Sequence, residues 1–326
     1  MSKPWENRSF YFGEDNFKEC MTAKVAPLIS RFCMEGYLRL GEHRKLHYHY
    51  FIHPKARGTI VICHGFCEGF FKYHEVMYYF YQAGYSVFLP EMRGHGYSTR
   101  EVENRCMVHV DDFMDYVEDL RVFLDEVVIP TTNHKKLILF SHSMGGCVAS
   151  LFLEEYPDYF AKAILSSPML GMQWSGTHPI LVKLLLWWSL LMHWTTRYMP
   201  GQRDFVPVSP YPNCSAQSRE RYEYQFHLRM AHLEYRTNGG DYCWGRAADK
   251  AMKQAIRNAR QIRIPTILFS AGEDALVSPE GQQKFLKRNP TVVYRSFPHA
   301  RHEIFNANEE DRIAYYLELF RFVEEA

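Results

Sequence analysis

The sequence has little net charge, no paired cysteines and no metal-ligand spacings. Its 38 Lys and Arg residues nearly cancel its 37 Asp and Glu residues, so no overall electrostatic field favours a nucleic acid as partner. The 8 cysteines form no CxxC pair, and several lie in apolar runs. This pattern is typical of buried reduced thiols rather than of a disulfide framework or a zinc site. We therefore expect no bound metal and no nucleic-acid partner.

No run of residues is both long and apolar enough to suggest a membrane-spanning helix. The most apolar stretch, 179–194, contains Lys183 and is shorter than the roughly 20 apolar residues that such a helix needs. The N-terminal sequence MSKPWENR also lacks the apolar core of an export signal. We expect a cytoplasmic protein, and peripheral contact with the inner membrane stays open.

Repeats, low-complexity segments and long flexible linkers are missing as well. The chain instead alternates short β-rich runs with helical patterns such as 74–83 and 111–127. This alternation favours an α/β fold, with helices flanking a mostly parallel central sheet. The expected strands are 46–52, 59–63, 86–89, 136–140, 161–166, 266–270 and 292–297.

One interval, 171–258, interrupts the alternation. It is rich in Trp, Tyr and Met, and it contains apolar helical patterns and a proline-rich connector. Open α/β sheets place their sites beyond the carboxyl ends of the strands. We therefore interpret the interval as a helical lid inserted between core strands. The chain then consists of a first core part at 1–170, the lid at 171–258 and a second core part at 259–326.

The expected strand 136–140 runs directly into SHSMGG at 141–146, and a helical pattern follows at once. Strand, tight turn and helix form the context of a nucleophile elbow, in which residues two before and two after the nucleophile must be small. Ser141 and Gly145 meet this requirement on either side of Ser143. The alternative is an ordinary turn rich in Ser and Gly, but the context favours Ser143 as a nucleophile.

An acid and a base follow later in the chain, each after an expected strand. Asp274 lies in the loop after 266–270, and His302 lies after 292–297. Ser, then Asp, then His is the order in which one fold of serine hydrolases arranges its catalytic triad. We assign His302 as the general base and Asp274 as the acid that orients it.

Each of these two assignments has a local competitor. Glu273 neighbours Asp274, and His299 lies three residues before His302. Asp274 is preferred because an apolar Ala-Leu-Val segment follows it. His302 is preferred because its His-Glu pair leads through two apolar residues into the last helical pattern.

Acyl transfer also needs hydrogen-bond donors for the oxyanion. The sequence HGFCE at 64–68 follows an early strand, and such a turn supplies one backbone N–H, while the residue after the nucleophile supplies the other. We assign these donors to Phe66 and Met144. We also expect His64 and Gly65 to contact the substrate. The alternative interpretation of this segment is a plain turn.

The segment RGHGYS at 93–98 has some of the glycines of a phosphate-binding loop. It lacks the third glycine of the dinucleotide motif, and no GK[ST] follows. We expect a structural loop beside the sheet, with Arg93 in an internal ion pair.

Taken together, these segments resemble one group of the α/β-hydrolases, the monoacylglycerol lipases and bacterial lysophospholipases. The similarity runs from about Gly58 to the C-terminus. Its markers are HGFCE at 64–68, KYHE at 72–75, RGHGYS at 93–98, SHSMGG at 141–146, GEDALV at 272–277 and ARHEIF at 300–305. Two residues depart from the group's pattern. Glu91 stands in place of Asp, and Ser141 in place of the first elbow Gly.

The resemblance implies the α/β-hydrolase fold with an inserted helical lid, and a hydrolase that uses neither metal nor cofactor. We predict a serine hydrolase that cleaves the carboxylic ester of a single-chain lipid, a lysophospholipid or a monoacylglycerol. One alternative is an esterase or peptidase that acts on small soluble substrates. An alternative of another class is a catalytically inactive binding protein with this fold.

The lid pattern at 180–194 is apolar nearly all round, so two faces of this helix need to be buried. The lid and the core can cover both faces. Alternatively, one face lines an acyl-chain tunnel above Ser143 while the other meets a membrane. We place Trp187 and Trp188 among the substrate-binding residues, and both also suit a membrane interface.

Overall fold

The computed structural model describes residues 3–132, 136–173, 179–209, 211 and 214–325. Within them, an eight-stranded sheet has the order β1-β2-β4-β3-β6-β7-β9-β10. The strands are β1 (Met34–Leu40), β2 (Arg44–Phe51), β3 (Thr59–Cys63), β4 (Ser86–Pro90), β6 (Leu137–His142), β7 (Lys162–Ser166), β9 (Thr266–Ala271) and β10 (Val293–Phe297). β2 pairs antiparallel with β1 and β4, and the other pairs are parallel. The prediction of a mostly parallel sheet is confirmed.

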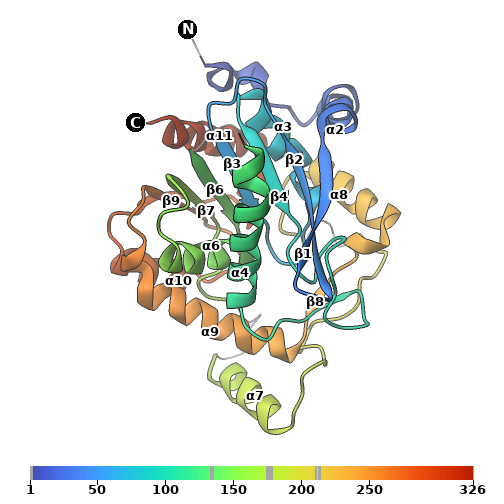
Figure 1. The fold of residues 1–326 in the computed structure, drawn as a ribbon, viewed down its shortest axis with the longest axis vertical. Coiled ribbons are helices and arrows are strands. Elements are labelled where there is room, and N and C mark those ends of the chain that lie inside the picture. Colours follow the sequence, from blue (N-terminus) through green and yellow to red (C-terminus); the bar gives the residue numbers. More distant parts are fainter. Residues whose placement is uncertain (1–2, 133–135, 174–178, 210, 212–213, 326) are drawn as a thin grey trace.

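Helices cover both faces of this sheet (Figure 1). Successive side chains of a strand point to opposite faces, and β3 shows the result: Val61 and Cys63 join one hydrophobic cluster, and Ile60 and Ile62 join the other. The helices of the first cluster are α4 (Met114–Phe123), α6 (Met144–Glu155), α9 (Tyr242–Asn258) and α10 (Pro279–Arg288). Those of the second are α1 (Phe17–Cys20), α2 (Ala26–Phe32), α3 (His74–Gln82) and α11 (Glu309–Glu324). All the central strands are therefore buried on both faces.

Every strand expected from the sequence is present, with ends that differ by at most two residues. The edge strand β1 is the one that sequence reasoning missed in the main sheet. Only Leu38 of β1 is buried, and charged residues such as Glu35 and Arg39 are exposed on it. An edge strand with so little apolar surface gives no alternating signal.

Between β7 and β9 the chain forms α7 (Pro179–Leu191), α8 (Arg219–Ala231), β8 (Gly239–Gly240) and α9, of which β8 pairs with β5 (Met107–Val108) in a small second sheet. α7 projects beyond α9 at one end of the molecule (Figure 1). α9 instead packs on α6 and α10, because its buried face carries small residues that permit close approach: Ala247, Ala248, Ala251 and Ala255. Much of α9 therefore belongs to the core layer rather than to a separate lid.

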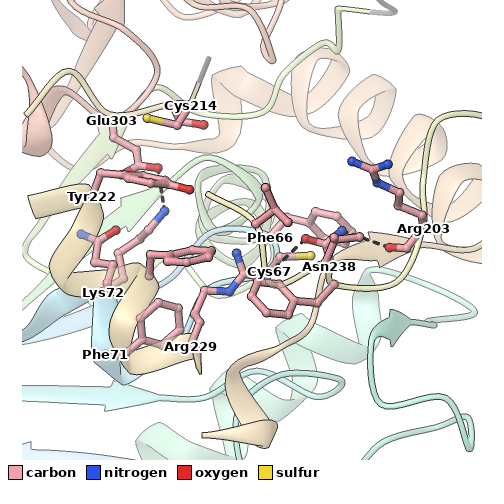
Figure 2. A pocket seen from close by; sticks show the side chains of 16 residues that line it. Phe66, Cys67, Phe71, Lys72, Arg203, Cys214, Tyr222, Arg229, Asn238 and Glu303 are labelled. Atoms are coloured by element: carbon pink, nitrogen blue, oxygen red, sulfur yellow. Dashed lines mark hydrogen bonds and ion pairs between the residues drawn. The ribbon is translucent and has the colours of Figure 1, made fainter. Parts of the chain in front are cut away.

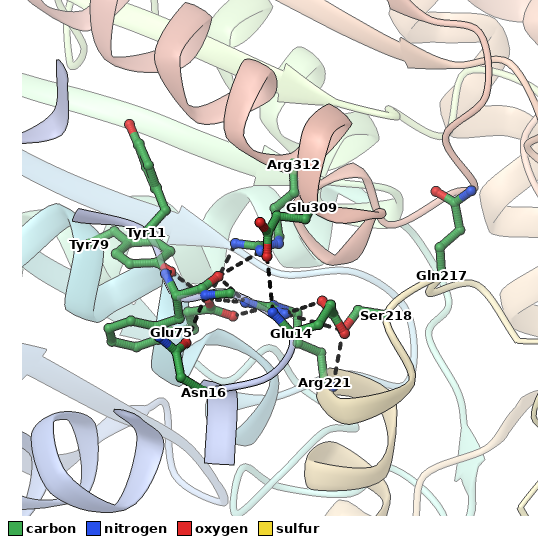
Figure 3. Close-up of polar contacts among 12 residues, drawn as sticks. Tyr11, Glu14, Asn16, Glu75, Tyr79, Gln217, Ser218, Arg221, Glu309 and Arg312 are labelled. Atoms are coloured by element: carbon green, nitrogen blue, oxygen red, sulfur yellow. Dashed lines mark hydrogen bonds and ion pairs between the residues drawn. The ribbon is translucent and has the colours of Figure 1, made fainter. Parts of the chain in front are cut away.

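A buried ion-pair network ties α8 to the core (Figure 3). Arg221 of α8 is 1% exposed and donates two hydrogen bonds of 2.8 Å to the carboxylate of Glu75 in α3. It also pairs with Glu14 and donates to the carbonyl of Phe12, which accepts a further bond from Arg312 of α11. Removing one partner of a buried ion pair leaves the other charge without a partner, which lowers the stability of the fold by about 3–5 kcal/mol. This network therefore fixes the position of α8.

Among the residues that the structure describes, no helix combines the length and the apolar character that crossing a membrane requires.

Candidate active site

Ser143 lies in the tight turn between β6 and α6. Its backbone has φ 52° and ψ −119°, a strained conformation for a residue with a side chain. The turn also requires glycine at position 145. A Cβ on Gly145 would lie 2.1 Å from the carbonyl oxygen of Cys63, and one on Gly146 would lie 2.6 Å from Pro168. These close approaches give Ser143 the geometry of a nucleophile elbow at the head of a helix.

Position 141 carries serine, whereas the monoacylglycerol lipases and bacterial lysophospholipases have glycine there. The buried hydroxyl of this serine has a hydrogen-bond partner. Ser141 is fully buried in β6, and its hydroxyl donates a 2.9 Å hydrogen bond to the carbonyl of Ile164 in the neighbouring strand. The departure therefore leaves the turn intact.

Asp274 and His302 meet beyond the ends of β9 and β10. The Nδ1 of His302 lies 2.6 Å from Oδ2 of Asp274, and both side chains are buried. Oδ1 of Asp274 accepts hydrogen bonds of 2.9 Å from the backbone N–H groups of Leu276 and Val277. Burial alone would raise the pKa of Asp274. The hydrogen bond from His302 and the two backbone donors outweigh burial and hold that pKa below its usual value.

The two competing residues lie elsewhere. Glu273 and His299 are both exposed, and neither is among the residues that line the pocket containing Ser143. An ionised Asp274 bound to Nδ1 leaves Nε2 of His302 as the nitrogen that can accept a proton.

Ser143 and His302 line the same pocket, of about 520 Å³. No hydrogen bond joins Oγ of Ser143 to His302 in the described part of the chain. Catalytic hydrogen bonds are often long in enzymes without substrate and tighten when it binds. Ser143 and the His302–Asp274 pair therefore face one cavity.

The two backbone N–H groups expected to bind the oxyanion are those of Phe66 and Met144. Within the described chain, neither N–H has a hydrogen-bond partner, whereas the flanking amides of Gly65 and Cys67 donate to Glu68 and His95. Phe66 also lines the pocket with Ser143. Unpaired donors beside a nucleophile are what an oxyanion hole requires.

His64 and Gly65, expected to contact the substrate, lie behind the pocket wall. His64 is fully buried, where its ring contacts the carbonyl of Gly65 and accepts a hydrogen bond from the backbone N–H of Met92. Neither residue lines the pocket. His64 ties the loop that presents Phe66 to the backbone of Met92, and Gly65 N–H donates to Glu68 within the loop.

Sequence reasoning missed a cluster of charges beneath the oxyanion loop. Glu68 accepts hydrogen bonds from Gly65 N–H, the Tyr73 hydroxyl and the Lys72 ammonium. Lys72 also donates to Glu303, the residue after His302. Burial would raise the pKa of Glu68, but the Lys72 ammonium outweighs it and keeps that pKa well below its usual range. The segment KYHE marked this position, but its sequence did not predict that the Lys72 side chain would be only 13% exposed.

His142 packs beside His302, with 4.7 Å between the centroids of the two rings. Its Nε2 is buried without a hydrogen-bond partner in the described residues. Burial lowers the pKa of His142 to about 4, so its ring is neutral near pH 7 and adds no charge next to His302.

The walls of the pocket are mainly apolar. They come from the elbow region, the acid loop and the segment between β7 and β9, and include Met169, Met172, Val182, Leu185, Leu186, Met199, Trp244, Leu276 and Val277. The expectation for Trp187 and Trp188 is not met by this geometry. They are 58% and 48% exposed on α7 and are not among the pocket's lining residues, because the opposite face of the helix carries Val182, Leu185 and Leu186 inward.

The RGHGYS loop is structural. Arg93 forms a bidentate pair with Asp119, with both hydrogen bonds at 2.7 Å, which confirms the expected internal ion pair. Glu91 is fully buried and accepts hydrogen bonds from the backbone N–H groups of Phe70 and Tyr97. Glu91, which stands in place of Asp, therefore joins the loop of Phe70 to the loop of Tyr97.

Two groups of side chains in the described residues have the spacing of metal ligands. They are Glu35, His47 and His49 in one place, and His109, Asp111 and Cys243 in another. Neither group lines the pocket of Ser143, so neither is placed to take part in chemistry there.

The fold and this site define an α/β-hydrolase. The family model described as serine aminopeptidase, S33, a hydrolase family, matches residues 54–311, and the chain belongs to this family. The chain is 26% identical over 296 residues to the probable lysophospholipase L2 of Haemophilus influenzae, covering 89% of this chain and 92% of that protein. It is 30% identical over 227 residues to lysophospholipase L2 of Escherichia coli, covering 70% and 66%.

Solved structures show the same fold. The monoacylglycerol lipase of Paleococcus ferrophilus aligns with a TM-score of 0.66 at 21% identity, over 86% of this chain and 99% of that one. A soluble variant of monoglyceride lipase from Saccharomyces cerevisiae, in complex with a substrate analog, aligns with the same TM-score at 18% identity, over 90% and 96%. The resemblance inferred from sequence motifs is confirmed.

Proposed function

We propose that the protein hydrolyses the carboxylic ester of a single-chain lipid through an acyl-enzyme on Ser143. The observation that carries this proposal is the position of Ser143 at an elbow in a pocket of about 520 Å³ with mainly apolar walls. The names of the relatives, lysophospholipase L2 and monoacylglycerol lipase, support the same substrate class.

In the proposed first step, Nε2 of His302 takes the proton from Ser143 as Oγ attacks the ester carbonyl. The N–H groups of Phe66 and Met144 bind the oxyanion, and His302 returns the proton to the departing glyceryl oxygen. In the second step, His302 takes a proton from water, which attacks the acyl-enzyme, and Ser143 recovers its proton as the fatty acid leaves. Asp274 holds the imidazole in the required tautomer throughout.

The apolar walls favour a lipid over the alternatives, a small soluble ester or a peptide. Each methylene removed from water contributes about 0.8 kcal/mol, so a single chain supplies most of the binding free energy without many polar contacts. A buried His302–Asp274 pair beside a serine in the elbow geometry also argues against a catalytically inactive binding protein.

A chain-length series tests this proposal. We expect kcat/KM for p-nitrophenyl esters, compared as monomers, to rise about threefold to fourfold per added methylene between butyrate and decanoate, because each methylene enters the apolar pocket. Initial rates below the critical micelle concentration of each ester measure this slope. A flat or falling series would assign the protein to small soluble substrates.

We also propose that the lid meets a membrane surface through the outer side of α7. Large apolar side chains are exposed there, in the same region as Lys183: Ile180, Leu181, Leu184, Trp187, Trp188, Leu190 and Leu191. An apolar patch of this kind with tryptophans and nearby basic groups suits the boundary between headgroups and acyl chains. The protein would then act at the surface of the inner membrane from the cytoplasm.

Replacing both tryptophans tests this contact. Trp187→Ser with Trp188→Ser is expected to lower co-sedimentation with vesicles severalfold, while hydrolysis of a soluble p-nitrophenyl ester is unchanged, because neither side chain lines the pocket. A double variant that sediments like the wild type would contradict contact through this face. A matched loss of activity on the soluble ester would instead mean that α7 needs these residues to hold its position.

A further inference from the structure

A second chamber, of about 340 Å³, adjoins the pocket of Ser143. The two share four wall residues: Phe66, Lys72, Ser215 and Glu303. Phe66 carries one of the proposed oxyanion donors, so the ester carbonyl is expected to lie beside it. The chamber therefore begins at the point where the acyl part and the alcohol part of a bound ester diverge. Figure 2 shows its polar side chains around this shared wall.

The walls of the two cavities differ in their charge. The pocket of Ser143 is mainly apolar, whereas the chamber is lined by Arg203 and Arg229 in addition to Lys72. The one acidic side chain among its described lining residues is Glu303. Both oxygens of Glu303 are occupied, one by Lys72 and the other by the side-chain amide of Asn306.

Arg229 is the central cation of the chamber. It donates hydrogen bonds only to neutral acceptors, the carbonyls of Tyr235 and Thr237 and the side chain of Asn238. No carboxylate of the described residues lies within ion-pair distance of it. Burial lowers its pKa, so its charge is poorly solvated and lacks a counterion.

The guanidinium is nevertheless held in a fixed position. Its central carbon lies 4.5 Å from the ring centroid of Phe205, and the Nε and Nη2 hydrogen bonds to the backbone fix its plane. Nη1 accounts for none of these bonds. A preorganised planar cation whose Nη1 has no bond of this kind is suited to an oxygen of a phosphate group.

Arg203 supplies a second positive charge. It is exposed at the wall of the chamber, and no ion pair to it is found in the described residues. The backbone carbonyl of Arg203 accepts a 3.0 Å hydrogen bond from Asn238, the same side chain that contacts Arg229. Asn238 therefore contacts the side chain of Arg229 and the backbone of Arg203 (Figure 2).

Resting on the proposed function, we propose that this chamber holds the phosphodiester headgroup of a lysophospholipid, with Arg229 and Arg203 as the groups that bind the phosphate. The acyl chain lies in the pocket of Ser143, and the ester carbonyl lies at Phe66, where the two cavities meet. The headgroup then continues into the chamber, where the uncompensated charge of Arg229 gains a counterion. A monoacylglycerol has no anion to place there, so the chamber selects between the two substrate classes.

The test compares two esters with the same acyl chain, decanoyl lysophosphatidylcholine and 1-decanoylglycerol, below their critical micelle concentrations. Arg229→Gln is expected to lower kcat/KM for the lysophospholipid by about 10- to 100-fold, the range for a lost hydrogen bond to a charged group. Activity on 1-decanoylglycerol should change less than about threefold. Arg203→Gln, at an exposed site, should show the same selectivity with a smaller loss, and Arg229→Lys should recover part of the activity.

Arg197→Gln is the matched control, because Arg197 is an exposed arginine of the same inserted segment that lines neither cavity. It should leave the ratio between the two substrates unchanged. An equal loss on both esters in Arg229→Gln, or no loss in either arginine variant, would overturn the headgroup site while leaving ester hydrolysis in place. A wild type that cleaves neither ester would instead overturn the proposed function.

Inhibition separates a headgroup from free phosphate as the ligand and does not depend on the folding of a variant. Glycerophosphocholine should inhibit hydrolysis of 1-decanoylglycerol by the wild type competitively, at concentrations where inorganic phosphate has little effect. Stronger inhibition by inorganic phosphate would assign the cations to free phosphate. No inhibition by either would contradict an anion site in the chamber.

Discussion

Ser143→Ala is expected to lower kcat for a short p-nitrophenyl ester by at least about 10,000-fold, to a level set by the oxyanion donors and substrate binding alone. The reason is that covalent catalysis has no substitute nucleophile at the elbow, and serine hydrolases that lose this residue drop by up to about a millionfold. Purified variant and wild type, assayed at saturating ester, give the ratio directly. The fold should be unaffected, because the alanine fits the space that Ser143 leaves.

Ser150→Ala is the matched control for this loss. Ser150 is a buried serine on α6, the helix that follows Ser143, and its hydroxyl donates to the carbonyl of Gly146. That variant should keep kcat within about threefold of the wild type. Retention of more than about 1% of the activity in Ser143→Ala would mean that another group is the nucleophile.

Asp274→Asn is expected to lower kcat by about 10,000-fold with the geometry of the site nearly intact. An amide in place of the carboxylate can donate to Nδ1 of His302 and so favour the tautomer that places the proton on Nε2, where it cannot accept the proton of Ser143. It also removes the negative charge that stabilises the imidazolium formed during attack. Comparing kcat across a pH series, together with thermal unfolding, separates this loss from misfolding.

Glu273→Gln provides the comparison, since Glu273 is the adjacent but exposed carboxylate. It should retain nearly full activity. If Glu273→Gln were the damaging change and Asp274→Asn the mild one, the acid of the triad would have been assigned to the wrong residue.

Much of the core could be predicted from sequence because its signals are local. The strands of the sheet are short apolar runs between turns, and SHSMGG lies directly between one of them and a helix. The elbow needs small residues at fixed positions around the nucleophile, so its geometry can be predicted from the local sequence. The order of Ser143, Asp274 and His302 followed from the same strand-by-strand interpretation.

What the sequence could not predict depends on contacts between distant segments. Helix α7 is apolar nearly all round, so its pattern gave no reason to place Leu185 rather than Trp188 at the pocket. The interval 171–258 was expected to form a lid, and the packing of the alanine-rich face of α9 on α6 was not predicted from its sequence. No role was predicted for Lys72 or Arg229, because the burial of a charged side chain is set by the segments that cover it.

Labelling with a fluorophosphonate, followed by mass spectrometry of the digested protein, identifies the nucleophile directly. We expect one covalent adduct on the folded wild type, located on Ser143 and formed with loss of esterase activity, and no adduct on Ser143→Ala. A wild type that hydrolyses esters but carries its adduct on another residue, or carries none, would contradict Ser143 as the nucleophile of this hydrolase.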